Sequence, residues 1–468
     1  MAASVPQKLV GIIGAGIAGP AFALQLLSHP RLASLYRPLL LDKTPDPSTL
    51  SSEDQAKKES ASFGAAVAVF PNGLHPLYAL GLREAVESAS LPLDIISFWK
   101  SPTASSTPHY EYGTIDHPTW SHGLQSDAIN IERSALRDML LKAARERGCE
   151  TMWDKKIKGF EEQDKGATKI NFEDGSDLTV DLLVGADGGY SMVRKYILDK
   201  RDPATAEKRW LPDFMHQTGF YGISKGFPYD KDVSSRATIG IWLDRGMLAS
   251  APVPGDKIRW DLVLPEKEAP PASRAVVDTP KSEGKFPWES AILPSAYSHD
   301  SSVEILQKHM NAFHPAAGTI GNLLENAEQI IRTPLRQRVW KAKEIQYGNV
   351  ALIGDAARLM LPSSGQGTGF GIEDATVLAA KLLEHSKSSA DQNDLRPALE
   401  AYARERVPRS KKMATVAWVT GKLAMADSWF WRWVRDFVSR WFPVGYNYKN
   451  DPKAKDPWPL DARFNVDR

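Results

Sequence analysis

The sequence predicts an α/β protein with three parts: a mostly parallel sheet flanked by helices, an interleaved α+β domain built on an antiparallel sheet, and a helical C-terminal region. An apolar strand at 9–13 runs into a glycine-rich turn and an apolar helix through Leu27, which begins the parallel part. Residues 196–330 lose helical periodicity, and alternating segments such as 238–242 and 259–264 indicate antiparallel strands. Helical spacing returns over much of 395–442.

Length and composition limit the classes of protein that fit. The 468 residues suffice for two or three domains, and the net charge of +1 gives no field that would attract nucleic acid. Cys149 is the single cysteine, which excludes an internal disulfide and a cysteine-based metal site and suits a reducing compartment. Glycines interrupt the apolar run at 10–27, so it is a strand and a helix rather than a signal peptide. We expect a cytoplasmic protein without a metal site.

The first motif is a dinucleotide-binding turn. Gly14, Gly16 and Gly19 stand between the strand at 9–13 and the following helix, in the GxGxxG spacing that lets a backbone approach a pyrophosphate. The helix N-terminus then offers unpaired N–H groups to the phosphates. Asp42 ends the next strand, where a carboxylate can accept hydrogen bonds from ribose hydroxyls.

Each of two further motifs follows a strand that is predicted to be buried. The segment 181–188 delivers Asp187 at a tight turn, and the strand at 350–353 delivers Asp355, whose carboxylate can bind a sugar-alcohol hydroxyl. Gly367 and Thr368 belong to a glycine-rich turn that leads into a helix at 372–383, and the N-terminus of that helix can hold the electron-rich end of a cofactor ring.

In this order, the three motifs resemble those of the group A FAD-dependent monooxygenases, the single-component aromatic hydroxylases of bacteria and fungi. Further matches lie at 64–67, 71–72, 81–82 and 131–136, and the resemblance covers about residues 9–410. It implies a Rossmann-like FAD-binding domain. The residues predicted to bind or line FAD are Gly14, Gly16, Gly19, Asp42, Gly64, Arg133, Asp187, Asp355, Gly367 and Thr368.

The resemblance also implies a division into interleaved segments. The FAD-binding domain is expected at 1–75, 128–195 and 331–390, and the substrate domain at 76–127 and 196–330. Residues 391–468 form the C-terminal helical region and tail. Two positions depart from the family pattern: Arg358 replaces the usual histidine after the GDAA segment, and Gly369 replaces an asparagine in the glycine-rich turn.

The implied activity is monooxygenation. A second dinucleotide motif is absent from the sequence, so NAD(P)H is expected as a transient electron donor, with O2 activated as a flavin C4a-hydroperoxide. The expected substrate is an aromatic, indolic or polycyclic natural product. The same flavin chemistry leaves epoxidation, Baeyer–Villiger oxidation and oxidative rearrangement open, and a non-catalytic flavin-binding protein is a more remote alternative.

Two residues match positions proposed for catalysis in phenol-hydroxylating relatives, namely Arg194 and Tyr221. Each also has a structural interpretation: an ion pair for Arg194, and a core or pocket-wall aromatic for Tyr221. Aromatic and apolar side chains of the 210–264 sheet are expected to wall the substrate pocket; they are Phe220, Tyr221, Ile241, Trp242 and Trp260.

Aromatic and arginine residues crowd the segment 427–442. Three interpretations are open for this predicted helix: packing over the pocket, a dimer contact, or a weak membrane-surface contact that would make the protein peripheral to a membrane.

Overall fold

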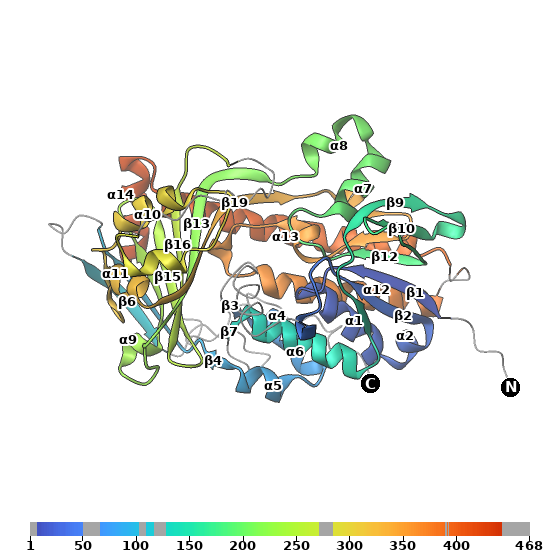
Figure 1. The fold of residues 1–468 in the computed structure, drawn as a ribbon, viewed down its shortest axis with the longest axis horizontal. Helices are drawn as coiled ribbons and strands as arrows, with labels where there is room; N and C mark the ends of the chain where they lie inside the picture. Colours follow the sequence, from blue (N-terminus) through green and yellow to red (C-terminus); the bar gives the residue numbers. More distant parts are fainter. Residues whose placement is uncertain are drawn as a thin grey trace.

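The computed structural model describes residues 7–49, 66–102, 109–116, 128–270, 284–388, 391 and 393–441. The predicted cofactor residue Gly64 lies outside this part of the chain. Figure 1 shows an elongated molecule with a parallel sheet and its helices at one end and a large, mostly antiparallel sheet at the other. This is the predicted α/β architecture.

The parallel sheet has the strand order β20 (Gln346–Tyr347), β21 (Val350–Leu352), β12 (Leu182–Gly185), β1 (Lys8–Ile13), β2 (Tyr36–Leu41) and β8 (Glu150–Met152). Every neighbouring pair is parallel except β20 and β21. Its central strands are continuous apolar runs because helices cover one face and a small antiparallel sheet, formed by residues 157–162, 168–172 and 177–180, packs on the other. The helices that supply most of this packing are α1 (Ala18–Ser28), α6 (Arg133–Glu146) and α12 (Gly367–Ser388).

The large sheet has the order β22 (Arg358–Leu359), β19 (Ala327–Val339), β13 (Asp213–Lys225), β16 (Lys257–Pro265), β15 (Met247–Val253), β14 (Thr238–Trp242), β5 (Ile95–Lys100) and β6 (Tyr110–Asp116). All neighbours are antiparallel except β14 and β5. The predicted antiparallel sheet is therefore present. Strand β19 crosses residue 330, where the sequence placed a division between domains; that division stays a prediction.

The two faces of the large sheet have different surroundings. Phe220, Ile241 and Trp260 lie in a core cluster with α10 (His299–Gln307), α11 (Ile320–Glu325) and the short helix η3 (Pro287–Ala291). Tyr221 and Trp242 lie in another cluster together with Leu361, Ala417 and Met425. The expectation that all five pocket-wall residues share one surface was wrong, because successive residues of a strand point to opposite faces.

Smaller elements complete the fold. Three strands form an antiparallel sheet in the order β3 (Ala66–Val69), β7 (Ile129–Glu132) and β4 (Ser90–Pro92), and another joins β9 (Ile157–Glu162), β10 (Thr168–Phe172) and β11 (Asp177–Val180). The pair β17 (Phe313–His314) and β18 (Gly318–Thr319) is short. The remaining α-helices are α2 (Pro30–Leu35), α4 (Pro71–Ala79), α5 (Arg83–Ser88), α7 (Met192–Arg201), α8 (Pro203–Arg209) and α9 (Val233–Arg236).

Two predicted element boundaries were wrong. The spacing of Leu136, Leu140 and Leu141 predicts a helix over 131–147, but the helix begins at Arg133, since Ile131 and Glu132 belong to β7. The apolar run at 178–184 predicts a single buried strand, but the structure has two strands there, β11 and β12, in different sheets. Asp181 lies between them and its backbone N–H donates to the Leu9 carbonyl, which starts the pairing with β1.

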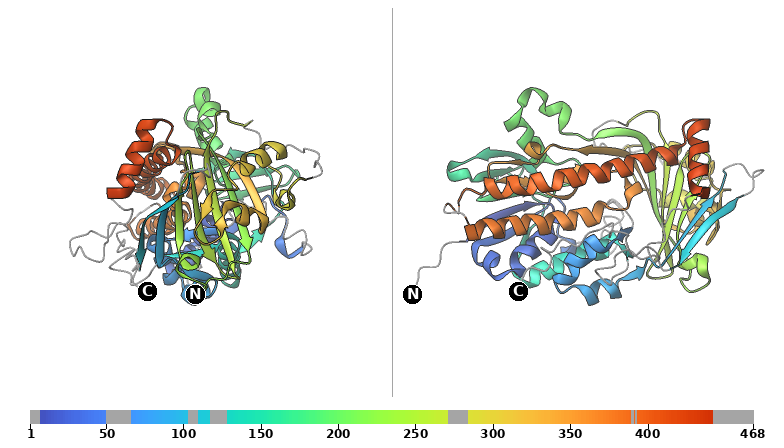
Figure 2. Two further views of the ribbon diagram at one scale, coloured as in Figure 1. Left: turned by 90° about the vertical axis from the view of Figure 1, so that its left-hand side faces the viewer. Right: turned by 180° about the vertical axis from the view of Figure 1, so that it is seen from behind.

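Two helices end the described chain. Helix α13 (Arg396–Met425) runs beside α12 and continues to the large sheet, where α14 (Trp429–Trp441) packs (Figure 2). Ala426 separates them in a left-handed conformation, with φ of 45°. Within the described ranges, no helix combines the length and apolarity needed to cross a bilayer.

Candidate active site

The glycine-rich turn has the tight geometry that the GxGxxG spacing predicts. Gly14 has a φ of 110°, and a Cβ built on it would lie 2.4 Å from the Ala186 carbonyl oxygen. A Cβ on Gly19 would lie 2.1 Å from the Gly14 carbonyl oxygen. At Gly16, in contrast, the nearest atom to an added Cβ is an Arg133 side-chain nitrogen at 3.8 Å. Gly14 and Gly19 are therefore required by the protein itself, whereas Gly16 borders space in front of the turn.

Asp42 holds the turn in place. Its Oδ2 accepts a hydrogen bond from the backbone N–H of Ala15 at 2.7 Å, and its Oδ1 accepts from the N–H and hydroxyl of Thr44, both at 2.8 Å. The carboxylate thus lies against the glycine-rich turn at the end of β2, as predicted. It reaches this position because β1 and β2 are parallel neighbours, so their carboxyl ends meet at one edge of the sheet.

Arg133 and Asp355 lie near each other. The Asp355 side chain is accessible to water, and Arg133 is partly accessible, yet protein encloses both on most sides. Burial raises the pKa of the Asp355 carboxyl, while the neighbouring charges of Arg133 and Arg358 oppose that rise. Burial likewise lowers the pKa of Arg133, and Asp355 opposes the change. Two predicted FAD ligands from segments more than 200 residues apart are thus brought together.

Asp187 and Arg194 organise the second motif. Asp187 Oδ2 accepts from the Met192 N–H at 2.7 Å at the start of α7, and burial raises the pKa of this carboxyl. The buried Arg194 guanidinium donates to three carbonyls: Gly189 at 2.6 Å, Trp210 at 2.7 Å and Ala356 at 2.8 Å. It also stacks 3.8 Å from the centre of the Trp340 ring. Arg194 therefore ties the Asp187 turn to the Asp355 turn.

The N-terminus of α12 forms another wall. Helix α12 begins at Gly367, whose added Cβ would meet no atom within 4 Å, and Thr368 is half-buried. Behind them, the amide of Asn72 lies against Gly369. Asn72 is buried, and its Oδ1 has no hydrogen-bond partner within the described chain. The family pattern places an asparagine at position 369; here that position is glycine, and the space beside it holds the amide of Asn72, which is one of the residues that match the family pattern.

Arg358, the replacement for the usual histidine, belongs to a buried ionic cluster. Its Nε donates to Ser410 Oγ at 2.6 Å and its Nη2 to the Asp374 carboxylate. Arg406 Nε donates to the other oxygen of Asp374 at 2.7 Å, and the Gly354 N–H donates to the first at 2.8 Å. Paired charges compensate the cost of burying Asp374. The substitution thus couples the Asp355 turn to helices α12 and α13.

Tyr221 lies on the sheet face that shares a cluster with Leu361, close to the glycine-rich turn before α12. Its strand partner is Asp261, and burial, followed by the charge of Asp261, raises the Tyr221 pKa, so the hydroxyl remains protonated. Arg259 Nη1 donates to Asp261 Oδ2 at 2.6 Å. The Arg259 Nε is buried without a partner among the described residues.

Asp261 and Arg259 were not predicted from the sequence, although two opposite charges two residues apart in an otherwise apolar strand are a usable signal for a buried pair. Burial raises the pKa of Asp261, and Arg259 opposes that rise. Asp261 and Tyr221 resemble Asp355, because each side chain is accessible to water at least in part although protein surrounds most of it.

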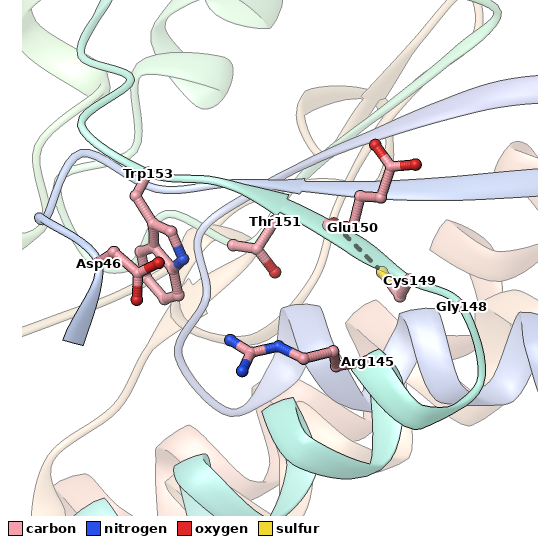
Figure 3. A pocket seen from close by; sticks show the side chains of 7 residues that line it. All are labelled: Asp46, Arg145, Gly148, Cys149, Glu150, Thr151 and Trp153. Atoms are coloured by element: carbon pink, nitrogen blue, oxygen red, sulfur yellow. Dashed lines mark hydrogen bonds between the residues drawn. The ribbon is translucent and has the colours of Figure 1, made fainter. Parts of the chain in front are cut away.

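A separate hollow of about 580 Å³ lies along the outer edge of β8 (Figure 3). Its lining residues are Asp46, Arg145, Gly148, Cys149, Glu150, Thr151 and Trp153. Burial raises the pKa of the Cys149 thiol to about 11, which makes it a poor nucleophile at neutral pH. The predicted motifs converge elsewhere, at the carboxyl ends of β1, β2 and β12.

These residues fit FAD. The glycine turn has open space at Gly16, and together with the N-terminus of α1 and the carboxylate of Asp42 it suits a dinucleotide. Arg133, Asp355 and the open start of α12 could contact the rest of the cofactor. Each predicted cofactor residue within the described chain lies at this convergence. Tyr221 lies on strand β13 of the large sheet. Arg194 instead donates hydrogen bonds to the turns that carry Asp187 and Asp355.

Comparisons with known proteins agree with this site. A family model described as an FAD binding domain matches residues 69–209 and 275–417, more than half of the chain. The chain is 26% identical over 432 residues to the salicylate hydroxylase of Pseudomonas putida, covering 88% of this chain and 85% of that protein. It is 25% identical over 444 residues to the 6-methylsalicylate 1-monooxygenase of Aspergillus terreus, covering 87% and 81%.

Among solved structures, HpxO of Klebsiella pneumoniae, crystallised with FAD and uric acid, matches with a TM-score of 0.62 at 18% identity, covering 92% of this chain and 93% of that one. A match at this identity establishes the fold. Together with the family model and the convergent motifs, this shared fold accounts for both the parallel sheet and the large antiparallel sheet. The chain therefore belongs to the FAD binding domain family and is one of the group A FAD-dependent monooxygenases, for which NAD(P)H is the usual electron donor.

Proposed function

We propose that the protein hydroxylates an aromatic substrate that carries an acidic or phenolic group, using NAD(P)H and O2. The observation that carries this proposal is the cluster of Tyr221, Asp261 and Arg259 on the sheet face that adjoins the glycine-rich turn before α12. FAD, when bound, supplies the redox chemistry: it accepts a hydride equivalent from NAD(P)H and activates oxygen.

The residues of the chain supply binding and proton positions. Tyr221 is held protonated and can donate a hydrogen bond to a substrate oxygen, which favours the phenolate form that reacts with an electrophilic oxygen. Arg259 has an unused buried N–H, which suits an anionic substrate group. Trp242, Met247 and Val263 give this cluster apolar neighbours that exclude water. Arg194 is a positioning residue in this proposal.

The relatives support an aromatic substrate. The names of two of them specify salicylate and 6-methylsalicylate, which combine a phenol with a carboxylate. Both groups match the donors of Tyr221 and Arg259. Larger indolic or polycyclic substrates, and the epoxidising, Baeyer–Villiger or rearranging outcomes, belong to the same proposal as alternatives that product analysis separates.

The test is an NADPH-oxidation assay of the FAD-loaded protein against a panel of phenolic and carboxylated arenes, with product masses measured. A substrate should stimulate NADPH oxidation and gain one oxygen atom. Tyr221→Phe should keep FAD and reduction but lower the ratio of hydroxylated product to NADPH consumed about tenfold or more. The proposal fails if no arene of the panel stimulates NADPH oxidation. The role of Tyr221 fails if Tyr221→Phe gives the same ratio of hydroxylated product to NADPH consumed as the wild type.

A further inference from the structure

Exposed hydrophobic side chains are concentrated in one surface region. Within the described ranges, ten large hydrophobic side chains are exposed, and eight of them lie between residues 416 and 437. We name these eight the 416–437 patch: Val416, Trp418, Val419, Trp429, Phe430, Trp431, Trp433 and Phe437. Trp429 is 74% exposed and Trp433 57%. A stretch of chain that exposes this many large apolar side chains often marks a binding surface.

Helix α14 packs on the protein through its polar side. Arg435, 1% exposed, donates to the Leu243 carbonyl at 2.8 Å, and Ser439 accepts from the indole N–H of Trp242 at 3.0 Å. Asp436 pairs with Lys100 of β5. A helix on a water-facing surface normally shows the reverse arrangement, with its apolar side inward. The hydrogen bonds to the sheet therefore fix α14 with its aromatic side outward.

The outward side of α14 carries residue types that are typical of a membrane–water interface. Trp429, Trp433, Phe437 and Arg440 are separated by four, four and three residues, so they share one face of the helix. The rings of Trp433 and Phe437 stack on this face with their centroids 5.4 Å apart. Tryptophan together with arginine is typical of helices that lie in a membrane–water interface.

The charge of this region favours an anionic partner. Residues 411–441 contain six basic side chains and two acidic ones, whereas the whole chain has a net charge of +1. Lys411, Lys412, Arg432 and Arg440 are exposed. Two copies of this surface would repel each other, but a layer of anionic headgroups would attract it.

We propose that the 416–437 patch docks the protein on an anionic lipid surface, with α14 lying in the plane of the interface. The aromatic rings enter the boundary between headgroups and acyl chains, and the exposed arginines and lysines contact phosphates. Since α14 is bonded to β5 and β14, docking places the large sheet next to the lipid. This inference stands on the surface of the protein and does not depend on the proposed substrate.

The test is flotation of the FAD-loaded full-length protein with vesicles of phosphatidylcholine alone or mixed with phosphatidylserine. Three variants are compared: Trp429→Ser with Trp433→Ser and Phe437→Ser, Arg432→Gln with Arg440→Gln, and the control Val233→Ser, which removes an exposed hydrophobic side chain elsewhere. Retained flavin absorbance and an unchanged melting temperature verify the fold of each variant.

The wild type and the control should float with the mixed vesicles, more weakly at high salt. The arginine variant should bind about 25-fold more weakly, since each basic residue near an anionic surface contributes about fivefold. The aromatic variant should lose binding by tenfold or more. The proposal is overturned if the wild type does not float, if the aromatic variant floats equally, or if flotation appears only after deletion of residues 442–468. If the wild type is a dimer that does not float and the aromatic variant is no longer a dimer, the patch mediates self-association. That result would also overturn the proposal.

Discussion

The side-chain amide of Asn72 occupies the space beside Gly369: a Cβ built on Gly369 would lie 3.0 Å from the amide nitrogen of Asn72 and 3.1 Å from its oxygen. The two positions are 297 residues apart in the sequence, yet Asn72 fits as it does only because position 369 has no side chain. Restoring the family residue at position 369 therefore requires Asn72 to move.

We predict that Gly369→Asn destabilises the FAD-free protein by about 1–3 kcal/mol, because the added side chain overpacks a filled space. Adding Asn72→Ala should recover much of that loss, so the two changes should be non-additive. Urea unfolding of the two single variants and the double variant measures the coupling. Additive effects would contradict the contact.

Arg194 is expected to act through structure. Arg194→Met removes the donors to three buried carbonyls and should lower the free energy of unfolding by about 3 kcal/mol or more. The matched control is Lys195→Met, which removes an exposed ion pair with Glu207 and should cost less than about 1 kcal/mol. Normal stability of Arg194→Met with a large loss of turnover would instead support a catalytic role.

Two glycines of the first motif should respond differently to alanine. Gly14→Ala places a methyl group against the Ala186 carbonyl at a positive φ, so the FAD-free protein should already be destabilised. Gly16→Ala meets nothing closer than 3.8 Å and should leave the FAD-free melting temperature within about 2 °C. FAD affinity, measured by flavin fluorescence, should fall about tenfold or more in Gly16→Ala, because the methyl group enters the path of the pyrophosphate. Unchanged affinity would place the cofactor elsewhere.

His314 should make the protein sensitive to acid. Burial lowers its pKa to about 3; Nδ1 accepts from the Ala317 N–H at 3.0 Å, and Nε2 lies 2.9 Å from Ser250 Oγ. Because the folded-state pKa lies below the unfolded value of about 6.5, this stabilisation is present above pH 6.5 and is lost as the pH falls toward 3.

Between pH 7.5 and pH 5 the loss from His314 should reach about 2 kcal/mol. Urea unfolding at both pH values measures it. His314→Asn should flatten the pH dependence, whereas the exposed His216→Asn should not. Equal pH dependence in wild type and His314→Asn would show that other groups dominate.

The sequence predicted the parallel, FAD-binding part of the fold well because glycine and aspartate at fixed positions have few structural alternatives. Gly14 and Asp42 lie where a strand–turn–helix unit must place them, and Asp355 follows from the next buried strand. The start of α6 at Arg133 was misplaced because an apolar residue such as Ile131 suits a short buried strand as well as a helix.

The substrate half was less predictable because its contacts join distant strands. The composition of 210–264 indicated strands but not their register, so the opposite orientations of Phe220 and Tyr221 were overlooked. The role of Asn72 and the orientation of α14 depend on partners far away in the sequence, and periodicity carries no information about such partners.

The strand order of the parallel sheet has a consequence for synthesis of the chain. Strand β1 needs β12 beside it, and β12 needs β21, so the pairing is incomplete until residue 352 has left the ribosome. Strand β1, which precedes the glycine-rich turn, can pair with β2 early but lacks its second neighbour until residue 185 has been translated. Such non-local pairing predicts slow folding and dependence on chaperones, so FAD capture is a late, post-translational event.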